Sequence, residues 1–173
     1  LCLTVASHFS ASYAAAELGA EEARRKSPET QIHVLDSQSA AGGEGLVAME
    51  ALRVVGAGGG LEEAVAAAER VMSKVRLIAL VDTLRYLWKS GRVPAIAHAG
   101  AALLQIKPIF ELAGGEVRTL ARPRTRRRAI RRVADLVAER VGRGGLHATV
   151  MHADAASYAA DLCQCLGDEL DCD

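Results

Sequence analysis

The order of apolar runs in the first part of the chain constrains the fold most. Residues 1–6 and 31–35 read as buried strands, because each is a short apolar run next to turn or helix signals. Helical segments are expected over residues 14–26, 40–55 and 61–74. This alternation of strands and helices is typical of a parallel sheet that is flanked by helices. The sequence therefore predicts an α/β fold.

The second part of the chain is expected to form another α/β lobe that contains a hairpin. An apolar strand over residues 76–81 leads into a short helix that stops at Ser90-Gly91, where glycine can take the left-handed conformation that ends a helix. Gly114-Gly115 separates the strand-like segments 105–112 and 117–121, which predicts a hairpin turn.

The remaining elements complete two expected lobes. They are a helix over residues 95–104, a helix that begins in an arginine-rich run and continues to Arg140, a strand over 148–151 and a helix over 155–166. We place the boundary between the lobes near residue 78, which gives domains 1–77 and 78–173.

The composition narrows the classes of function. Half of the residues are apolar but only 3% are aromatic, so we expect a core of alanine, valine, leucine and isoleucine. The formal net charge is zero, and no global field draws the chain toward nucleic acid or a membrane surface. No uninterrupted apolar run approaches about 18 residues, so no membrane span is expected. The cysteines are few and scattered, which favours free thiols, a cytoplasmic location and no metal site.

Hydroxyl groups gather where the first expected strand enters its helix. Ser7, Ser10 and Ser12 lie at this entrance, where a serine can cap the helix and free amides can meet an anion. One serine suffices for capping, so ligand contact and simple capping are both open for the others. Asp36 and Ser37 follow the second strand, at the end where open α/β sheets bind their ligands.

Two arginine features are also open to two interpretations. Arg92 follows the helix stop at Gly91, where it can meet an anionic ligand or cap the carbonyl groups of the preceding helix. An arginine-rich run lies at the start of a later helix and is either a docking surface for an acidic partner protein or a solvated face. Its members are Arg122, Arg124, Arg126, Arg127, Arg128, Arg131 and Arg132. Nucleic-acid binding is not expected, because no stacking aromatic residues accompany these cations.

The sequence contains none of the common catalytic motifs, such as a G-x-S-x-G elbow, an H-E-x-x-H pair or a P-loop. Hydroxyls at a helix entrance, a turn arginine and an aliphatic core suit a ligand with an anionic head and an apolar body. Burial of such a body stabilises the complex by roughly 0.8 kcal/mol for each methylene group.

Several motifs resemble those of the DegV family of fatty-acid-binding α/β proteins. Residues 7–13 (S-H-F-S-A-S-Y) are similar to the family's S-x-x-L-S-G-T-Y segment. Residues 82–93 (D-T-L-R-Y-L-W-K-S-G-R-V) are close to its T-L-E-Y-L-x-x-G-G-R-I signature. Asp36-Ser37 with Gly42 and Gly45, and residues 103–109 (L-L-Q-I-K-P-I) with Gly114-Gly115, match two further segments. Ala11 and Ser90 depart from the pattern, since each replaces a glycine.

The resemblance implies a two-lobed fatty-acid carrier that is not an enzyme and needs no cofactor. Ser10, with Ser12 in the place of a threonine, would hold the carboxylate of a long-chain fatty acid. Arg92 would either lie near the lipid site or hold the two domains together. Arg124, Arg126 and Arg127 would then face a fatty acid kinase. The family's T-S-Q-P and H-T-G-P-G segments have no counterpart in this sequence, so we expect the chain to be a fragment.

Two rival functions belong to other classes. Ser10 could be the nucleophile of a small acyl hydrolase or transferase. Alternatively, the arginine-rich face could serve a regulatory module that binds nucleic acid with a steep salt dependence.

Overall fold

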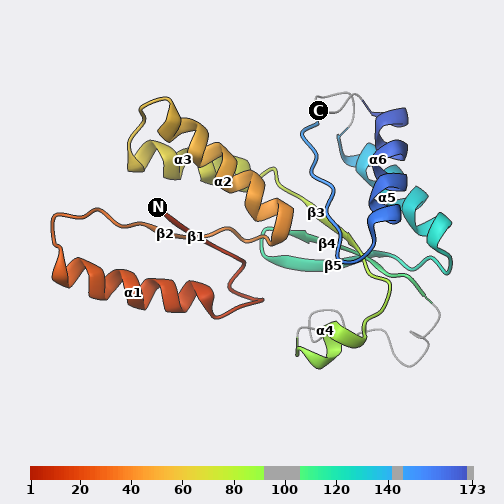
Figure 1. Ribbon diagram of the computed structural model, residues 1–173, viewed down its shortest axis with the longest axis horizontal. Coiled ribbons are helices and arrows are strands. Elements are labelled where there is room, and N and C mark those ends of the chain that lie inside the picture. Colours follow the sequence, from red (N-terminus) through yellow and green to blue (C-terminus); the bar gives the residue numbers. More distant parts are fainter. Residues whose placement is uncertain (92–105, 142–145, 171–173) are drawn as a thin grey trace. The chain divides into compact units, whose positions relative to one another are not determined.

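The computed structural model describes residues 1–91, 106–141 and 146–170 (Figure 1). The helices are α1 (Ser12–Lys26), α2 (Ala41–Gly56), α3 (Leu61–Met72), α4 (Arg85–Lys89), α5 (Arg126–Val141) and α6 (Ala156–Glu169). The strands are β1 (Cys2–Thr4), β2 (Val34–Asp36), β3 (Leu77–Leu80), β4 (Ile109–Ala113) and β5 (Glu116–Ala121).

The contacts divide the chain into two compact units. The first contains Leu1–Leu77 and also Leu112–Glu116, which is the turn region of the β4–β5 hairpin. The second contains Ile78–Glu111 and Val117–Asp173. The domain boundary that the sequence suggests near residue 78 stays a prediction, because compactness within one chain does not test whether each part folds independently.

The first unit is built on a parallel pair of strands. β1 and β2 pair in the register Cys2↔Val34, Leu3↔Leu35 and Thr4↔Asp36. In Figure 1 the strands lie between α1 on one side and α2 with α3 on the other. The core of this unit is aliphatic, as the composition predicts, and consists of Val47, Ala51, Ala64, Ala68 and Val75.

The second unit packs helices against an antiparallel sheet. The sheet has three strands in the order β3-β4-β5, and β4 and β5 form the predicted hairpin, whose turn belongs to the first unit. Ile109 from β4 packs with Val133 and Leu136 from α5. The apolar stripe of α5 therefore faces the sheet, and the arginines of its first turn are exposed to solvent. The predicted α/β class, with a parallel sheet, flanking helices and a hairpin, is confirmed.

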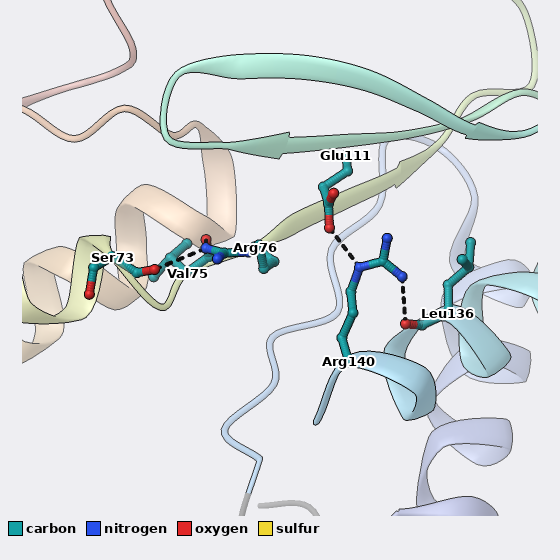
Figure 2. A network of polar contacts seen from close by, with 6 residues as sticks. All are labelled: Ser73, Val75, Arg76, Glu111, Leu136 and Arg140. Atoms are coloured by element: carbon teal, nitrogen blue, oxygen red, sulfur yellow. Dashed lines mark hydrogen bonds and ion pairs between the residues drawn. The ribbon is translucent and has the colours of Figure 1, made fainter. Parts of the chain in front are cut away.

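An ion pair with little exposure fastens α5 to β4. The Nε atom of Arg140 lies 2.7 Å from Oε1 of Glu111, and Nη1 of Arg140 donates a hydrogen bond of 3.0 Å to the carbonyl oxygen of Leu136. Figure 2 shows the Arg140 guanidinium between these two acceptors, and also shows Arg76 donating to the carbonyl groups of Ser73 and Val75. The Glu111 side chain is only 11% exposed, so the ion pair neutralises a charge that water barely reaches.

The strand expected over residues 148–151 is wrong. The structure has no strand in this described segment, and only Leu146 forms an isolated bridge. Residues 147–151 do alternate between exposed and half-buried, as a strand would. Alternation alone does not make a strand, however, because the backbone also needs a neighbouring strand as hydrogen-bond partner. The expected helix over 95–104 lies outside the described residues.

Candidate functional site

The candidate site lies at the carboxyl edge of the parallel strands. Because Thr4 pairs with Asp36, β1 and β2 end side by side, and the loops that follow them start at the same edge. The amide of Ser37 donates to the carbonyl of Thr4 at 3.0 Å, and the amide of Ala6 donates to the carbonyl of Ser39 at 2.7 Å. These bonds join the two loops into one edge, where α/β sheets commonly bind ligands.

Ser10 and Ser12 are brought together at this edge. Their hydroxyl oxygens are 2.6 Å apart, and Ser10 Oγ also accepts a hydrogen bond of 3.1 Å from the amide of Ser12. Both residues are half-buried. The two hydroxyls have two protons but share one hydrogen bond, and no acceptor for the second proton is present among the described residues. One hydroxyl proton is therefore left for an external acceptor.

Capping of α1 differs from the expected arrangement. Ala11 directly precedes the helix and has no side chain that can cap it. Ser10 instead reaches over Ala11 and accepts from the first helical amide, that of Ser12. One serine thus has a capping role, as expected, and the same oxygen belongs to the hydroxyl pair.

Asp36 ties the two loops together. Its Oδ2 atom accepts from the amide of Ser7 at 3.2 Å, and its Oδ1 atom accepts from the amide of Gln38 at 2.8 Å. Burial by itself would raise the pKa of Asp36. Hydrogen bonds from Ser7 and Gln38, together with the nearby charge of His8, outweigh burial and lower this pKa. Asp36 is therefore an anion that is already satisfied by the protein, and the serine pair is the better partner for a carboxylate.

Tyr13 lies near the same edge. A hydrogen bond with Glu17 is the main cause that raises its pKa, with further contributions from the charge of Glu17, from burial and from the charge of Asp36. The phenol consequently stays protonated. Sequence reasoning did not single out Tyr13 for the site, because a tyrosine in the first turn of a helix carries no distinctive spacing.

Two buried hydroxyls lie behind the edge. Thr4 is 6% exposed and Ser39 is 3% exposed, and neither hydroxyl oxygen has a hydrogen-bond partner within the described parts of the chain. Ser37 is also buried, and its hydroxyl bonds to the backbone of Ser39. The Ser37 hydroxyl is therefore already bonded within the loop after β2.

Arg92 lies outside the described residues, so its role stays a prediction. The helix stop that precedes it is present. Gly91 has a φ of +71°, and the hydroxyl of Ser90 donates to the carbonyl of Leu87 at 2.9 Å. The predicted left-handed glycine at this helix end is confirmed.

The three predicted docking arginines are all exposed but differ in their contacts. The guanidinium of Arg126 lies over the ring of Tyr158 from α6, a cation–π contact that joins the two helices. Arg124 and Arg127 have no ion-pair partner among the residues that the structure describes. By contrast, Arg132 pairs with Glu139 at 2.7 Å.

The described residues contain neither a metal-binding cluster nor a membrane-spanning helix. In residues 1–91, 106–141 and 146–170, no group of three metal-binding side chains is close enough to hold an ion. No helix within those ranges combines the length and the apolar character needed to cross a membrane.

The fold and the edge define an α/β protein with hydroxyl groups placed at the carboxyl ends of parallel strands. The family model described as "Uncharacterised protein, DegV family" matches residues 1–171. The chain therefore belongs to the DegV family, and the resemblance seen in its motifs is confirmed.

Relatives and solved structures agree with this assignment. A DegV domain-containing protein of Streptomyces coelicolor is 32% identical over 166 residues, which are 96% of this chain and 59% of that protein. A DegV family crystal structure from Ruminococcus gnavus, described with vaccenic acid, is 29% identical and superposes with a TM-score of 0.84 over 98% of this chain and 62% of that one. A Thermotoga maritima structure described as revealing a fatty acid binding function is 25% identical, with a TM-score of 0.75 over 98% of this chain and 58% of that one.

The chain spans only part of the length of its relatives. It spans 59% of the Streptomyces protein and 62% of the Ruminococcus chain. The binding sites of these relatives can include residues outside the matched part. The activity of this chain is therefore proposed below and is not taken over from them.

Proposed function

We propose that this protein binds a long-chain fatty acid and that Ser10 and Ser12 hold its carboxylate. The observation that carries the proposal is the pair of hydroxyls 2.6 Å apart, with one proton left to donate, at the carboxyl edge of the parallel strands. The vaccenic acid named for the Ruminococcus structure and the fatty acid binding function named for the Thermotoga structure support the same class of ligand.

The chemistry of the edge suits a carboxylate held by neutral donors. A hydroxyl that donates to an ionised acceptor makes a short, strong hydrogen bond. In this proposal, Arg92 adds a positive charge near the carboxylate and aliphatic side chains form a tunnel around the acyl tail. The tail then contributes roughly 0.8 kcal/mol for each buried methylene group.

A carrier is favoured over the rival hydrolase or transferase. A serine nucleophile needs a general base within hydrogen-bond reach. The hydroxyl partner of Ser10 is another serine, Ser12, and no histidine or carboxylate bonds to Ser10 in the described chain. The arrangement offers a hydrogen-bond donor but does not activate a nucleophile.

Replacement of Ser10 by alanine separates the two functions. We expect Ser10→Ala to weaken vaccenate binding about tenfold, because it removes a charge-assisted hydrogen bond. Ser157→Ala, a change at an exposed serine of α6, is the matched control and should leave the affinity unchanged. Calorimetric titration of vaccenate into each variant measures the affinity. Hydrolysis of an acyl ester that is present in the unmodified protein and absent in Ser10→Ala would instead favour the enzyme.

We further propose a fatty acid kinase as the protein partner, with Arg124, Arg126 and Arg127 on the docking surface. Arg124 and Arg127 are the better candidates, because Arg126 is engaged with Tyr158. Charge reversal of Arg124 and Arg127 should weaken association with the kinase of the same organism, whereas Lys74→Glu on the other unit should not. Equal binding by all of these variants in a surface-plasmon assay would contradict this part of the proposal.

A cytoplasmic location belongs to the same proposal. The described cysteines Cys2, Cys163 and Cys165 are free thiols, which suits a reducing compartment.

A further inference from the structure

A hairpin turn far along the sequence reaches the candidate site. Gly114 and Gly115 have φ angles of +57° and +77°, as the tight turn between β4 and β5 requires. The amide of Gly115 donates a hydrogen bond of 3.1 Å to the carbonyl of Gln38, in the loop after β2. A Cβ atom at Gly115 would lie 3.7 Å from Nδ1 of His8, in the loop after β1. The turn is therefore bonded to the loop after β2 and lies beside the loop after β1.

Gln38 has a backbone conformation that needs support. Its φ angle is +53°, in the left-handed region that residues with side chains seldom adopt. Its carbonyl is held by Gly115, and its amide donates to Oδ1 of Asp36 at 2.8 Å. A strained residue of this kind persists when its surroundings fix it from more than one side.

Asp36 connects Gln38 to the segment Ser7–Ser12, which contains the two serines of the hydroxyl pair. Its other oxygen, Oδ2, accepts from the amide of Ser7, three residues before Ser10. The segment is held again where the amide of Phe9 donates to the carbonyl of Ala6 at 2.9 Å. A chain of three hydrogen bonds thus runs from Gly115 through Gln38 and Asp36 to Ser7.

We propose that Gly115, Gln38 and Asp36 form a positioning relay, by which the turn of the β4–β5 hairpin sets the geometry of the Ser10–Ser12 hydroxyl pair. None of the three needs to touch the ligand. The effect of the relay on a fatty acid carboxylate rests on the proposed function, whereas its effect on the order of the segment Ser7–Ser12 does not.

The relay is tested by breaking it at two separate links. Asp36→Asn keeps the shape of the side chain, but its amide nitrogen cannot accept a hydrogen bond, so one of the two loop contacts is lost. Gly115→Ala strains the left-handed backbone at the donor to Gln38. Gly58→Ala is the matched control, because it adds the same kind of left-handed strain between α2 and α3, outside the hairpin turn, where a Cβ atom meets nothing within 4 Å.

Amide hydrogen exchange followed by mass spectrometry reads the order of the segment without any ligand. We expect exchange in Ser7–Ser12 to quicken about tenfold in Asp36→Asn and in Gly115→Ala, and to stay near the unmodified rate in Gly58→Ala. The double variant should be no faster than the faster single variant, because both changes break the same chain of bonds. Unchanged exchange in Asp36→Asn, or additive effects in the double variant, would overturn the relay.

Titration with vaccenate then links the relay to binding. We expect Asp36→Asn to lose affinity about tenfold, in line with the looser serine segment. If the segment loosens and the unmodified protein binds no vaccenate, the proposed function fails while the relay stands. If vaccenate binds equally well to both proteins although the segment has loosened, the positioning role is contradicted.

Discussion

At the scale of single residues, two glycines of α2 differ sharply in their surroundings. A Cβ atom on Gly43 would overlap Oγ of the buried Ser39 and lie 3.2 Å from Cγ1 of Val75, whereas one on Gly45 would meet nothing within 4 Å. The first turn of α2 can thus approach the loop after β2 only because Gly43 has no side chain.

The first prediction compares alanine at these two positions. Gly43→Ala should destabilise the protein by about 1–3 kcal/mol, because a methyl group overpacks the site. Gly45→Ala should stabilise it by about 0.5–1 kcal/mol, since alanine is the better helix former in open space. Chemical denaturation of both variants measures the difference, and equal effects would contradict the packing described for Gly43.

The second prediction at this scale concerns Asp36 and the pH dependence of stability. Its folded-state pKa lies below the ordinary value of 3.8, so the unfolded chain binds more protons in acid. The stabilisation from Asp36 is fully present above the unfolded pKa and is lost as the pH falls through the folded one. Asp36→Asn should therefore have a lower free energy of unfolding than the unmodified protein at neutral pH. The difference between the two free energies should become smaller below about pH 4.

Denaturant midpoints measured from about pH 6 to about pH 2 test this dependence. A constant difference between the two proteins over the whole range would show that the Asp36 carboxylate has no favourable partners in the folded state. A direct titration of the carboxyl carbon by NMR should give a pKa below 3.8.

Residue-level features of the site were only partly predictable. The serines could be placed at a helix entrance, because hydroxyls after a strand and before an alanine-rich helix have few other uses. The hydrogen bond between the Ser10 and Ser12 hydroxyls could not be predicted, because it depends on the dihedral angles of the loop. The hydrogen bond between Gly115 and Gln38 joins positions far apart in sequence. It could not be predicted, because neither a glycine nor a glutamine indicates such a partner.

At the scale of elements, the attachment of α5 depends on the ion pair between Arg140 and Glu111. Removing one partner of a buried pair leaves an uncompensated charge, which costs more than the pair contributes. Arg140 is 30% exposed and Glu111 11% exposed on their side chains, so water can relieve only part of that cost.

The prediction is that Arg140→Ala destabilises the protein by about 3 kcal/mol. The double variant Glu111→Leu with Arg140→Met should recover most of the loss, because an apolar pair leaves no charge behind. Arg132→Ala breaks an exposed pair on the same helix and should change stability by less than about 1 kcal/mol. Urea denaturation distinguishes these cases, and a large effect of Arg132→Ala comparable with that of Arg140→Ala would contradict the role given to burial.

Most helices could be predicted from sequence, and one strand could not. The helices begin and end near their expected limits, because apolar spacing, Ser27-Pro28 and the glycines mark them locally. The hairpin was also predictable, since Gly114-Gly115 supplies the left-handed residues that the turn needs. Residues 148–151 were mistaken for a strand, because pairing with a neighbour is a property of the fold and not of the segment.

At the scale of the whole molecule, family and fold are established and the ligand is proposed. The motifs that carry the family resemblance are spread along the chain, so the sequence alone suffices to indicate the family. The edge described above supplies hydroxyl donors, and Arg92 and the tunnel for the acyl tail are still predictions. The central claim is that a fatty acid is held by its carboxylate at Ser10.

The most direct test is mass spectrometry of the protein expressed from its complete gene and purified without denaturation. We expect about one acyl chain per molecule of the unmodified protein, as for a single buried ligand site. We also expect a clear loss of that acyl chain in Ser10→Ala, with retention in Ser157→Ala. An unmodified protein that carries no acyl chain and gains none after incubation with vaccenate would contradict the claim, and so would full retention in Ser10→Ala.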